Sequence, residues 1–222
     1  MYTEYKHDFN KSMKTYIENE LYSLASNYLQ NTNATIICGP EALRTHLIAR
    51  NTGLVQTRTP VYVERNPAIC SSIQRQLSNQ HATVVNDDII NLRTTNFIDF
   101  DVTGAITAQS GATFASLLKS QHNLLGIKAI IYTFALRPIS LNTTLRQLTS
   151  LINKELKADI NFSVAKLSHS KELRRKWKQE TYAPIVHCNQ LNSTFNSAIY
   201  ESRGFYYNSG GGHMLSGILI YE

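Results

Sequence analysis

Val61-Tyr62-Val63-Glu64-Arg65-Asn66-Pro67 is the stretch that decides the fold of this 222-residue chain. Its β-branched and aromatic residues favour a strand, and Asn66-Pro67 ends that strand and opens a helix over residues 68–77. A strand that ends in a carboxylate and passes at once into a helix is typical of the carboxyl edge of a parallel α/β sheet. There the two carboxylate oxygens of Glu64 match the two hydroxyl groups of a ribose. The alternative interpretation is an exposed Glu64 paired with a neighbouring Lys or Arg.

The residues before this stretch complete a strand–turn–helix–strand unit. Residues 34–38 form a short apolar run, Gly39 suits a turn, and Pro40 and Glu41 suit the first turn of a helix that extends to residue 50. Nucleotide-binding turns usually carry two or three glycines, and this turn has Gly39 alone. A purely structural turn at Gly39 therefore remains open.

Strands and helices alternate along most of the chain. An amphipathic helix is predicted for residues 8–29, where it packs over the sheet or, as the alternative, binds a partner. Its apolar stripe consists of Phe9, Met13, Ile17, Leu21, Leu24 and Tyr28, and between them lie the polar residues Lys11, Lys14, Glu18 and Asn27. Further strands are predicted at 82–85, 97–101 and 127–134, further helices at 114–122 and 140–156, and a terminal hairpin from 204–208 and 214–221. This pattern predicts an α/β, Rossmann-like, doubly wound and mostly parallel seven-stranded sheet with helices on both faces and a C-terminal antiparallel hairpin strand.

Acidic residues mark three successive predicted strand ends: Glu64, then Asp87 and Asp88, then Asp99 and Asp101. The carboxyl ends of parallel strands meet at one edge of a sheet, where ligands of such folds bind. We therefore expect a ligand site at this edge, although any one of these acids also suits a helix cap.

The composition limits the class of protein. Hydrophobic residues make up 42% of the chain and charged residues 17%, which favours a soluble globular domain. No apolar run reaches the length of a membrane span, and the first residues lack signal-peptide character. Cys38, Cys70 and Cys188 are scattered and odd in number, which argues against a disulfide scaffold and favours a reducing compartment. We expect a cytoplasmic protein with no membrane association and no metal site.

The net charge of +6 favours an anionic partner, with nucleic acid as the leading candidate. The sharpest basic cluster is Arg174, Arg175, Lys176 and Lys178 around Trp177. Such a combination holds phosphates and stacks a base. The alternative is a solvated helix face with Trp177 turned into the core.

Four segments together resemble the successive ligand-binding segments of class I S-adenosylmethionine-dependent methyltransferases. They are Ile36-Ile37-Cys38-Gly39-Pro40-Glu41-Ala42-Leu43, the opening stretch around Glu64, Asn86-Asp87-Asp88, and Ile98-Asp99-Phe100-Asp101-Val102-Thr103-Gly104. The resemblance covers residues 34–136, and the terminal hairpin is similar to the reversed last strand of that family. It implies one domain over residues 1–222, with an N-terminal helix in 1–30, a cofactor-binding core in 34–136, and acceptor-side helices with the hairpin in 137–222.

The resemblance also implies roles for individual residues. Gly39 would lie under the methionine part of S-adenosylmethionine, Glu64 would hold the ribose, and Asp87 or Asp88 would face the adenine. The segment from Asp101 would border the transferred methyl group. The implied cofactor-binding residues are Cys38, Gly39, Pro40, Glu64, Arg65, Asp87, Asp88 and Asp99, and the implied catalytic residues are Asp101 and Thr103.

The chain departs from the family pattern at two places. Its glycine loop is reduced to Cys38-Gly39-Pro40-Glu41, and Asp101-Val102-Thr103-Gly104 lacks the Pro-Pro-aromatic pattern of enzymes that methylate nucleic-acid amino groups. We expect an S-adenosylmethionine-dependent methyltransferase with an RNA or DNA acceptor. The alternatives are a non-catalytic protein of this fold that binds nucleic acid or a protein partner, and an enzyme that uses S-adenosylmethionine, or another nucleotide, for different chemistry.

Overall fold

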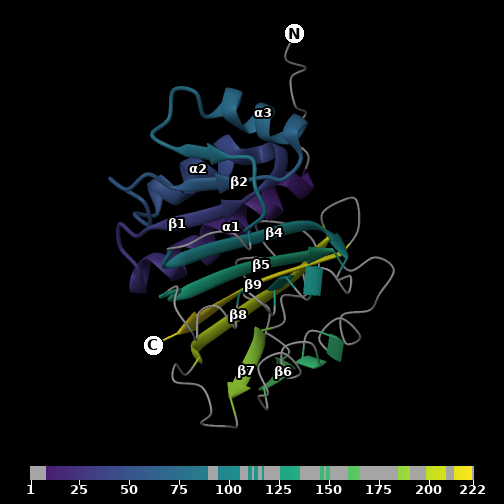
Figure 1. Ribbon diagram of the computed structural model, residues 1–222. Coiled ribbons are helices and arrows are strands. Elements are labelled where there is room, and N and C mark those ends of the chain that lie inside the picture. The colour runs from purple at the N-terminus through teal and green to yellow at the C-terminus, as the bar shows by residue number, and fades with distance from the viewer. Residues whose placement is uncertain are drawn as a thin grey trace.

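The computed structural model describes residues 9–89, 95–105, 110–111, 113–114, 117, 126–135, 146–147, 149–150, 160–165, 185–190, 199–208 and 213–221 (Figure 1). Helical elements are α1 (Phe9–Tyr28), the 3₁₀ helix η1 (Gly39–Glu41), α2 (Ala42–Asn51) and α3 (Pro67–Gln76). The strands are β1 (Ala34–Ile37), β2 (Val61–Val63), β3 (Thr83–Val85), β4 (Phe97–Ala105), β5 (Ala129–Ala135), β6 (Ile160–Ala165), β7 (Ile185–Gln190), β8 (Ile199–Asn208) and β9 (His213–Tyr221).

Seven of these strands form one sheet in the order β3-β2-β1-β4-β5-β9-β8. The first five are parallel, and β9 enters antiparallel between β5 and β8. The predicted mostly parallel, seven-stranded Rossmann-like sheet with a reversed C-terminal hairpin is therefore confirmed. Apolar strands such as β5, which is buried along nearly its whole length, suit a sheet covered on both faces.

The order of the strands reverses between β1 and β4. From β1 the chain proceeds outward to β2 and β3, then returns to pair β4 with the other side of β1, where Ile37 lies opposite Phe100. Connections leave the sheet in opposite directions at such a point, so a crevice opens beyond the carboxyl ends of the two strands. The segments that follow β1 and β4 are therefore the first place to look for a ligand.

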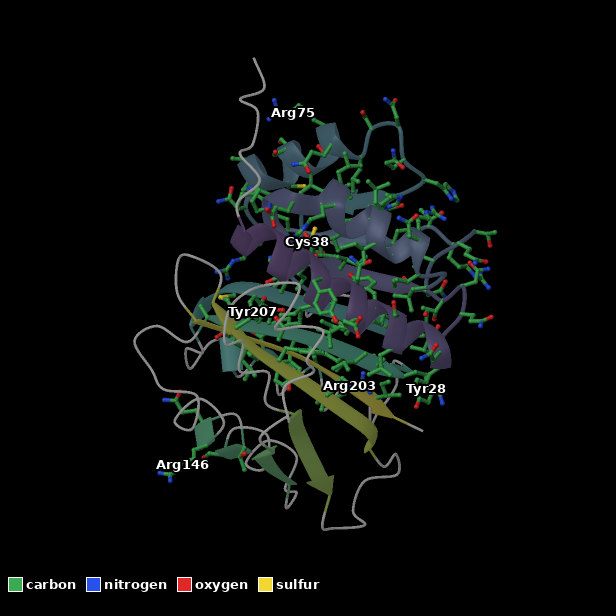
Figure 2. The ribbon with its side chains drawn as sticks, turned by 180° about the vertical axis from the view of Figure 1, so that it is seen from behind. Tyr28, Cys38, Arg75, Arg146, Arg203 and Tyr207 are labelled. Carbon is green, nitrogen blue, oxygen red and sulfur yellow. The ribbon has the colours of Figure 1, made fainter. Side chains whose placement is uncertain are left out.

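Helices α1, α2 and α3 pack against the same face of the sheet and share its main hydrophobic core. Figure 2 shows α1 and α2 in front of the strands on this face. On α1, the predicted apolar positions Ile17, Leu21 and Leu24 are buried, and Tyr22 adds a fully buried ring. Tyr28, which was predicted to share this stripe, is 43% exposed instead. It lies where α1 reaches the amino edge of the sheet, beyond the core.

The opposite face of the sheet carries an aromatic cluster. Phe100 on β4 and Tyr132 and Phe134 on β5 pack around Phe114, with ring centroids 5.5–6.1 Å apart. Phe114 belongs to the segment predicted as a helix over 114–122, and it is helical where that segment is described. Two separate cores thus hold the sheet, and β4 contributes alternate residues to each.

Local sequence signals explain several element ends. The side chain of Asn66 caps α3 by accepting hydrogen bonds from the amides of Ala68 and Ile69, and Pro67 occupies the first turn. One prediction needs correction. The strand predicted at 97–101 continues as β4 through Val102, Thr103 and Gly104 to Ala105, because it pairs with β5 as far as Ala135.

The strands β6 and β7 were not predicted, and they form a separate two-stranded antiparallel sheet. Among the described helices, none combines the length and the apolar character that a membrane crossing requires.

Candidate active site at the carboxyl edge of the sheet

The turn after β1 presents open backbone to this edge. Gly39 has a φ of +57°, in the left-handed region that favours glycine, and a Cβ atom added there would meet nothing within 4 Å. Cys38 before it is buried, and burial raises the pKa of its thiol well above the ordinary value. Pro40 is exposed, and its carbonyl accepts a 2.7 Å hydrogen bond from Gln76 of α3. The turn is thus anchored from below while the space over Gly39 stays free of described atoms.

The ends of β2 and β3 are tied to each other beside this turn. The backbone amide of Glu64 donates to Val85, and the side chain of Asn86 donates a 2.7 Å hydrogen bond to the carbonyl of Glu64. The half-buried Glu64 carboxylate accepts a 2.7 Å hydrogen bond from the amide of Asn66 through Oε1. Arg65 is exposed. Glu64 is therefore held in place by backbone contacts at the position predicted for it.

Asp87 and Asp88 are both exposed just beyond β3. The amide of Asp88 donates a 2.7 Å hydrogen bond to Oδ1 of Asp87. The structure thus brings Gly39, Glu64, Asp87 and Asp88 to consecutive strand ends along one edge of the sheet.

Asp99 and Asp101 lie within β4 rather than beyond its end. They occupy alternate positions of the strand, so both face α1. Asp99 is buried and accepts a 2.6 Å hydrogen bond from the hydroxyl group of Tyr22. Asp101 accepts a 2.7 Å hydrogen bond from the ammonium group of Lys14, near the start of α1. Thr103 continues β4, and the structure describes its backbone but not its side chain.

Asp101 belongs to an ion-pair cluster that joins four elements. Besides Asp101, Lys14 lies 3.9 Å from a carboxylate oxygen of Glu18 and 3.9 Å from one of Glu41. Arg44 of α2 pairs with Glu18 and with Glu41 at 2.9 Å each. We call Lys14, Glu18, Glu41, Arg44 and Asp101 the Lys14 cluster. It connects α1, the glycine turn, α2 and β4.

Burial governs the electrostatics of the cluster. Burial favours the neutral amine of Lys14, but the negative charges of Asp101 and Glu18 outweigh it and raise the pKa of Lys14. Burial also raises the pKa of Glu18 to about 7, against the opposing effects of Arg44 and Lys14. Burial and then the nearby Asp101 also raise the pKa of Asp99 well above the ordinary value.

Two buried carboxylate oxygens in the cluster have no hydrogen-bond partner among the described residues. They are Oδ1 of Asp101 and Oε2 of Glu18, on side chains of residues that are 5% and 8% exposed. A buried carboxylate oxygen without a donor destabilises the folded state, because no hydrogen bond compensates for the loss of its contacts with water. These oxygens are therefore candidate acceptors for a ligand.

No family model matches the sequence, and no curated protein matches it either. Solved structures do resemble the fold. TrmN from Thermus thermophilus superposes with a TM-score of 0.53 at 9% identity over 92% of this chain. The plantazolicin methyltransferase BamL, solved with SAH (S-adenosylhomocysteine), gives 0.52 at 14% identity over 93% of this chain and 83% of its own. The Bacillus subtilis tRNA methyltransferase TrmK gives 0.48 at 14% identity over 91% of this chain.

The chain has the fold of a class I methyltransferase. It spans 48% of the length of TrmN and 65% of that of TrmK. At these identities the likeness concerns the fold alone.

A polar row extends from Asp101 across this methyltransferase fold. Thr133 on β5 lies in register with Asp101 and with Ser216 on β9, so all three side chains share the face of α1. The hydroxyl groups of Thr133 and Ser216 are 2.9 Å apart, and that of Tyr207 on β8 is 3.0 Å from Ser216. Buried hydroxyls that bond one another leave this part of the face polar next to the candidate acceptor oxygen of Asp101.

The candidate nucleic-acid residues Arg174, Arg175, Lys176, Trp177 and Lys178 lie outside the described residues. In the described part of the chain, no group of three or more His, Cys, Asp or Glu residues is arranged to hold a metal ion. The site residues that sequence reasoning missed are Lys14, Glu18 and Arg44. A signal for them existed, because two aspartates on one face of an otherwise apolar strand require donors from the helix that covers it.

Proposed function

We propose that this chain is a methyltransferase that binds S-adenosylmethionine over Gly39, in the crevice between the ends of β1 and β4. One observation carries the proposal. The turn at Gly39, open enough for a ligand to approach the backbone, lies at the same reversal of strand order as the buried Oδ1 of Asp101, which has no partner among the described residues.

The residues at the edge fit this cofactor. The open space over Gly39 would receive the methionine part, Glu64 would accept hydrogen bonds from the ribose hydroxyls, and Asp87 or Asp88 would accept from the adenine amino group. Each carboxylate oxygen has a second acceptor site, so Oε1 of Glu64 serves Asn66 and a ribose together. Arg65, Cys38 and Pro40 would border the same ligand. When bound, S-adenosylmethionine supplies an activated methyl group on a sulfonium.

The protein's part in such a reaction is mainly positioning. Lys14 fixes one oxygen of Asp101, which leaves Oδ1 to accept a hydrogen bond from the amine or hydroxyl group of the methyl acceptor. Thr103, two residues after Asp101 on β4, would border the methyl acceptor. Asp99 is occupied by Tyr22 beneath the site, and its proposed contribution to cofactor binding is to shape the wall behind Cys38.

A calorimetric titration of the whole chain tests this proposal. S-adenosylmethionine and S-adenosylhomocysteine should bind with a stoichiometry of about one, while NAD should not bind. Tight binding of NAD alone would overturn the methyltransferase assignment. Binding of S-adenosylmethionine without methyl transfer to any acceptor offered would favour the non-catalytic alternative. The single glycine of the turn is the feature that supports this alternative.

For the acceptor we propose nucleic acid. The net charge of +6 and the run of Arg174, Arg175, Lys176 and Lys178 beside Trp177 support it, because cations neutralise phosphates and an indole ring stacks on bases. The location we propose is cytoplasmic, where the free thiols of Cys38 and Cys70 would stay reduced.

Salt dependence of binding tests the nucleic-acid proposal. Binding to RNA or DNA should weaken with a log–log slope of roughly −0.7 to −0.9 per phosphate engaged. Replacing Arg174 and Arg175 together should flatten the slope by about one to two units for all sequences alike. Trp177→Ala should weaken single strands more than duplexes. Undetectable binding at low salt would overturn a nucleic-acid acceptor and leave the cofactor proposal standing.

A further inference from the structure

The Lys14 cluster holds more negative than positive groups. Its carboxylates are Glu18, Glu41 and Asp101, and its cations are Lys14 and Arg44, so three carboxylates face two cations. Asp99 lies close by, and burial together with Asp101 raises its pKa well above the ordinary value, which favours its neutral form.

Two of these carboxylates each have one oxygen that lacks a hydrogen-bond partner among the described residues. Oε2 of Glu18 and Oδ1 of Asp101 are buried and unpartnered within the described part of the chain. Glu18 and Asp101 belong to α1 and β4, and both are linked through Lys14 to Glu41, which ends η1. Because η1 begins at Gly39, the cluster adjoins the turn over which the cofactor is proposed to bind.

We propose that the Lys14 cluster selects the cationic methyl donor over its neutral product, with Glu18 and Asp101 as specificity-determining residues. The inference rests on the proposed function and deepens it. S-adenosylmethionine and S-adenosylhomocysteine differ by one methyl group and one positive charge. The buried carboxylates of Glu18 and Asp101 therefore favour binding of the sulfonium over the thioether.

Coulomb's law sets the size of the effect. At an effective dielectric constant of about 20 and a separation of about 10 Å, one carboxylate charge changes affinity by roughly tenfold. Screening by salt reduces this little, because the carboxylates of Glu18 and Asp101 are buried. A preference of this size favours release of the product after each transfer.

The selection should depend on pH through Glu18. The groups that face Glu18 are Lys14 on its own helix, Arg44 on α2, Glu41 on η1 and Asp101 on β4. Burial raises the pKa of Glu18 to about 7, so a bound cation that lowers this pKa releases a proton at neutral pH. The affinity for S-adenosylmethionine should rise as pH rises through about 7, while that for S-adenosylhomocysteine should change little.

The test is the ratio of the two dissociation constants, Kd for S-adenosylhomocysteine over Kd for S-adenosylmethionine, measured by calorimetry at about pH 8 and about pH 6. The wild-type ratio should be larger at the higher pH. Glu18→Gln should lower the ratio by several-fold and abolish its pH dependence, whereas Lys14→Met, which removes a cation, should raise it. Glu20→Gln is the matched control, because it makes the same substitution on α1 at a residue outside the cluster. This variant should give the wild-type ratio at both pH values.

The opposite signs expected for Glu18→Gln and Lys14→Met separate charge selection from simple damage, which would weaken both ligands together. Proton release measured on the wild-type chain, by titration in buffers of different ionisation enthalpy, needs no variant. Equal ratios in all variants and no proton release on binding S-adenosylmethionine would overturn the inference alone. Failure of the wild-type chain to bind either ligand would overturn the proposed function with it.

Discussion

The hydroxyl group of Tyr22 on α1 donates a 2.6 Å hydrogen bond to Oδ2 of Asp99 on β4, inside the buried face of the sheet. Tyr22 also packs its ring against Phe97, two residues before Asp99 on the same face of the strand. The Tyr22 side chain thus provides both an apolar ring that packs in the core and the hydrogen-bond donor that a buried carboxyl group needs. Helix and sheet are joined here by one directional contact in an otherwise apolar interface.

Removal of the phenol oxygen should destabilise the protein. Tyr22→Phe keeps the ring but leaves Asp99 buried without its donor, so we expect a loss of about 1–3 kcal/mol in the free energy of unfolding. Chemical denaturation measures it. Tyr28→Phe, on the same helix at an exposed position, should change stability by less than about 0.5 kcal/mol. Equal effects of the two variants would contradict this role of Tyr22.

The stability of the protein should fall as pH rises above about 4, because burial raises the pKa of Asp99 well above the value of 3.8 that it has when unfolded. The native state holds this proton where the unfolded state has lost it, so stability is complete below the unfolded pKa and declines toward the folded one. Asp99→Asn removes this titration and still accepts from Tyr22. Its stability relative to wild type should improve with pH, by at most about 1.4 kcal/mol per pH unit. A variant with an unchanged pH profile would show that Asp99 does not titrate in this range.

Glu64 should matter for cofactor affinity and little for folding. Glu64→Gln keeps an acceptor for the amide of Asn66 but loses the negative charge, and Glu64→Ala loses both. We expect Glu64→Ala to weaken S-adenosylmethionine binding by about tenfold or more in a calorimetric titration, with Glu64→Gln in between. Unchanged affinity in a folded Glu64→Ala variant would rule out the ribose contact.

Asp101 should serve both the fold and the reaction. Asp101→Ala leaves Lys14 without its 2.7 Å partner, although Glu18 and Glu41 remain at 3.9 Å, so we expect a loss of about 1–3 kcal/mol in stability. Asp101→Asn retains an acceptor for Lys14 and should lose less. Methyl transfer by folded Asp101→Asn should fall by about a hundredfold or more if Oδ1 contacts the acceptor. Full activity in Asp101→Asn would confine this residue to a structural role.

Gly217 should tolerate no side chain. A Cβ atom there would lie 2.9 Å from the carbonyl oxygen of Arg203 and would overlap the phenol end of Tyr132. Gly217→Ala forces β5, β8 and β9 apart at their central register, so we expect a loss of about 1–3 kcal/mol or more, seen as a lower Tm. Gly126→Ala is a useful comparison, since its cost arises from the positive φ of 63° alone. A Tm for Gly217→Ala at or above that of Gly126→Ala would contradict the overlap.

Sequence reasoning reached the strands and helices of the mostly parallel sheet because their signals are local. Asn66-Pro67 opens α3 through contacts within a few residues, and the apolar run of β5 identifies a strand covered on both faces. The same reasoning placed Lys14 and Glu18 among the polar residues between the apolar positions of α1. They are instead drawn inward by Asp101, a residue 87 positions away from Lys14. Helical periodicity carries no information about such a distant partner.

The strands β6 and β7 escaped prediction for a related reason. Asn161 and Ser163 alternate with the apolar residues of β6, which is a strand pattern, but the partner strand follows only after a long intervening segment. Short half-polar strands are recognised by the partner that satisfies their backbone, and that partner is not local. The predicted site residues Gly39, Glu64, Asp87 and Asp88 could be found because each directly follows a recognisable strand.

The position of β9 has a consequence for biosynthesis. β5 leaves the ribosome long before β8 and β9, yet its free side is paired by β9 alone. Until residues 213–221 have been translated, the nascent chain presents the apolar residues Ile130 and Ile131 on an open strand edge, which is a template for aggregation. The sheet therefore closes only after translation of its last strand. Until then we expect a holdase chaperone to bind the exposed edge of β5.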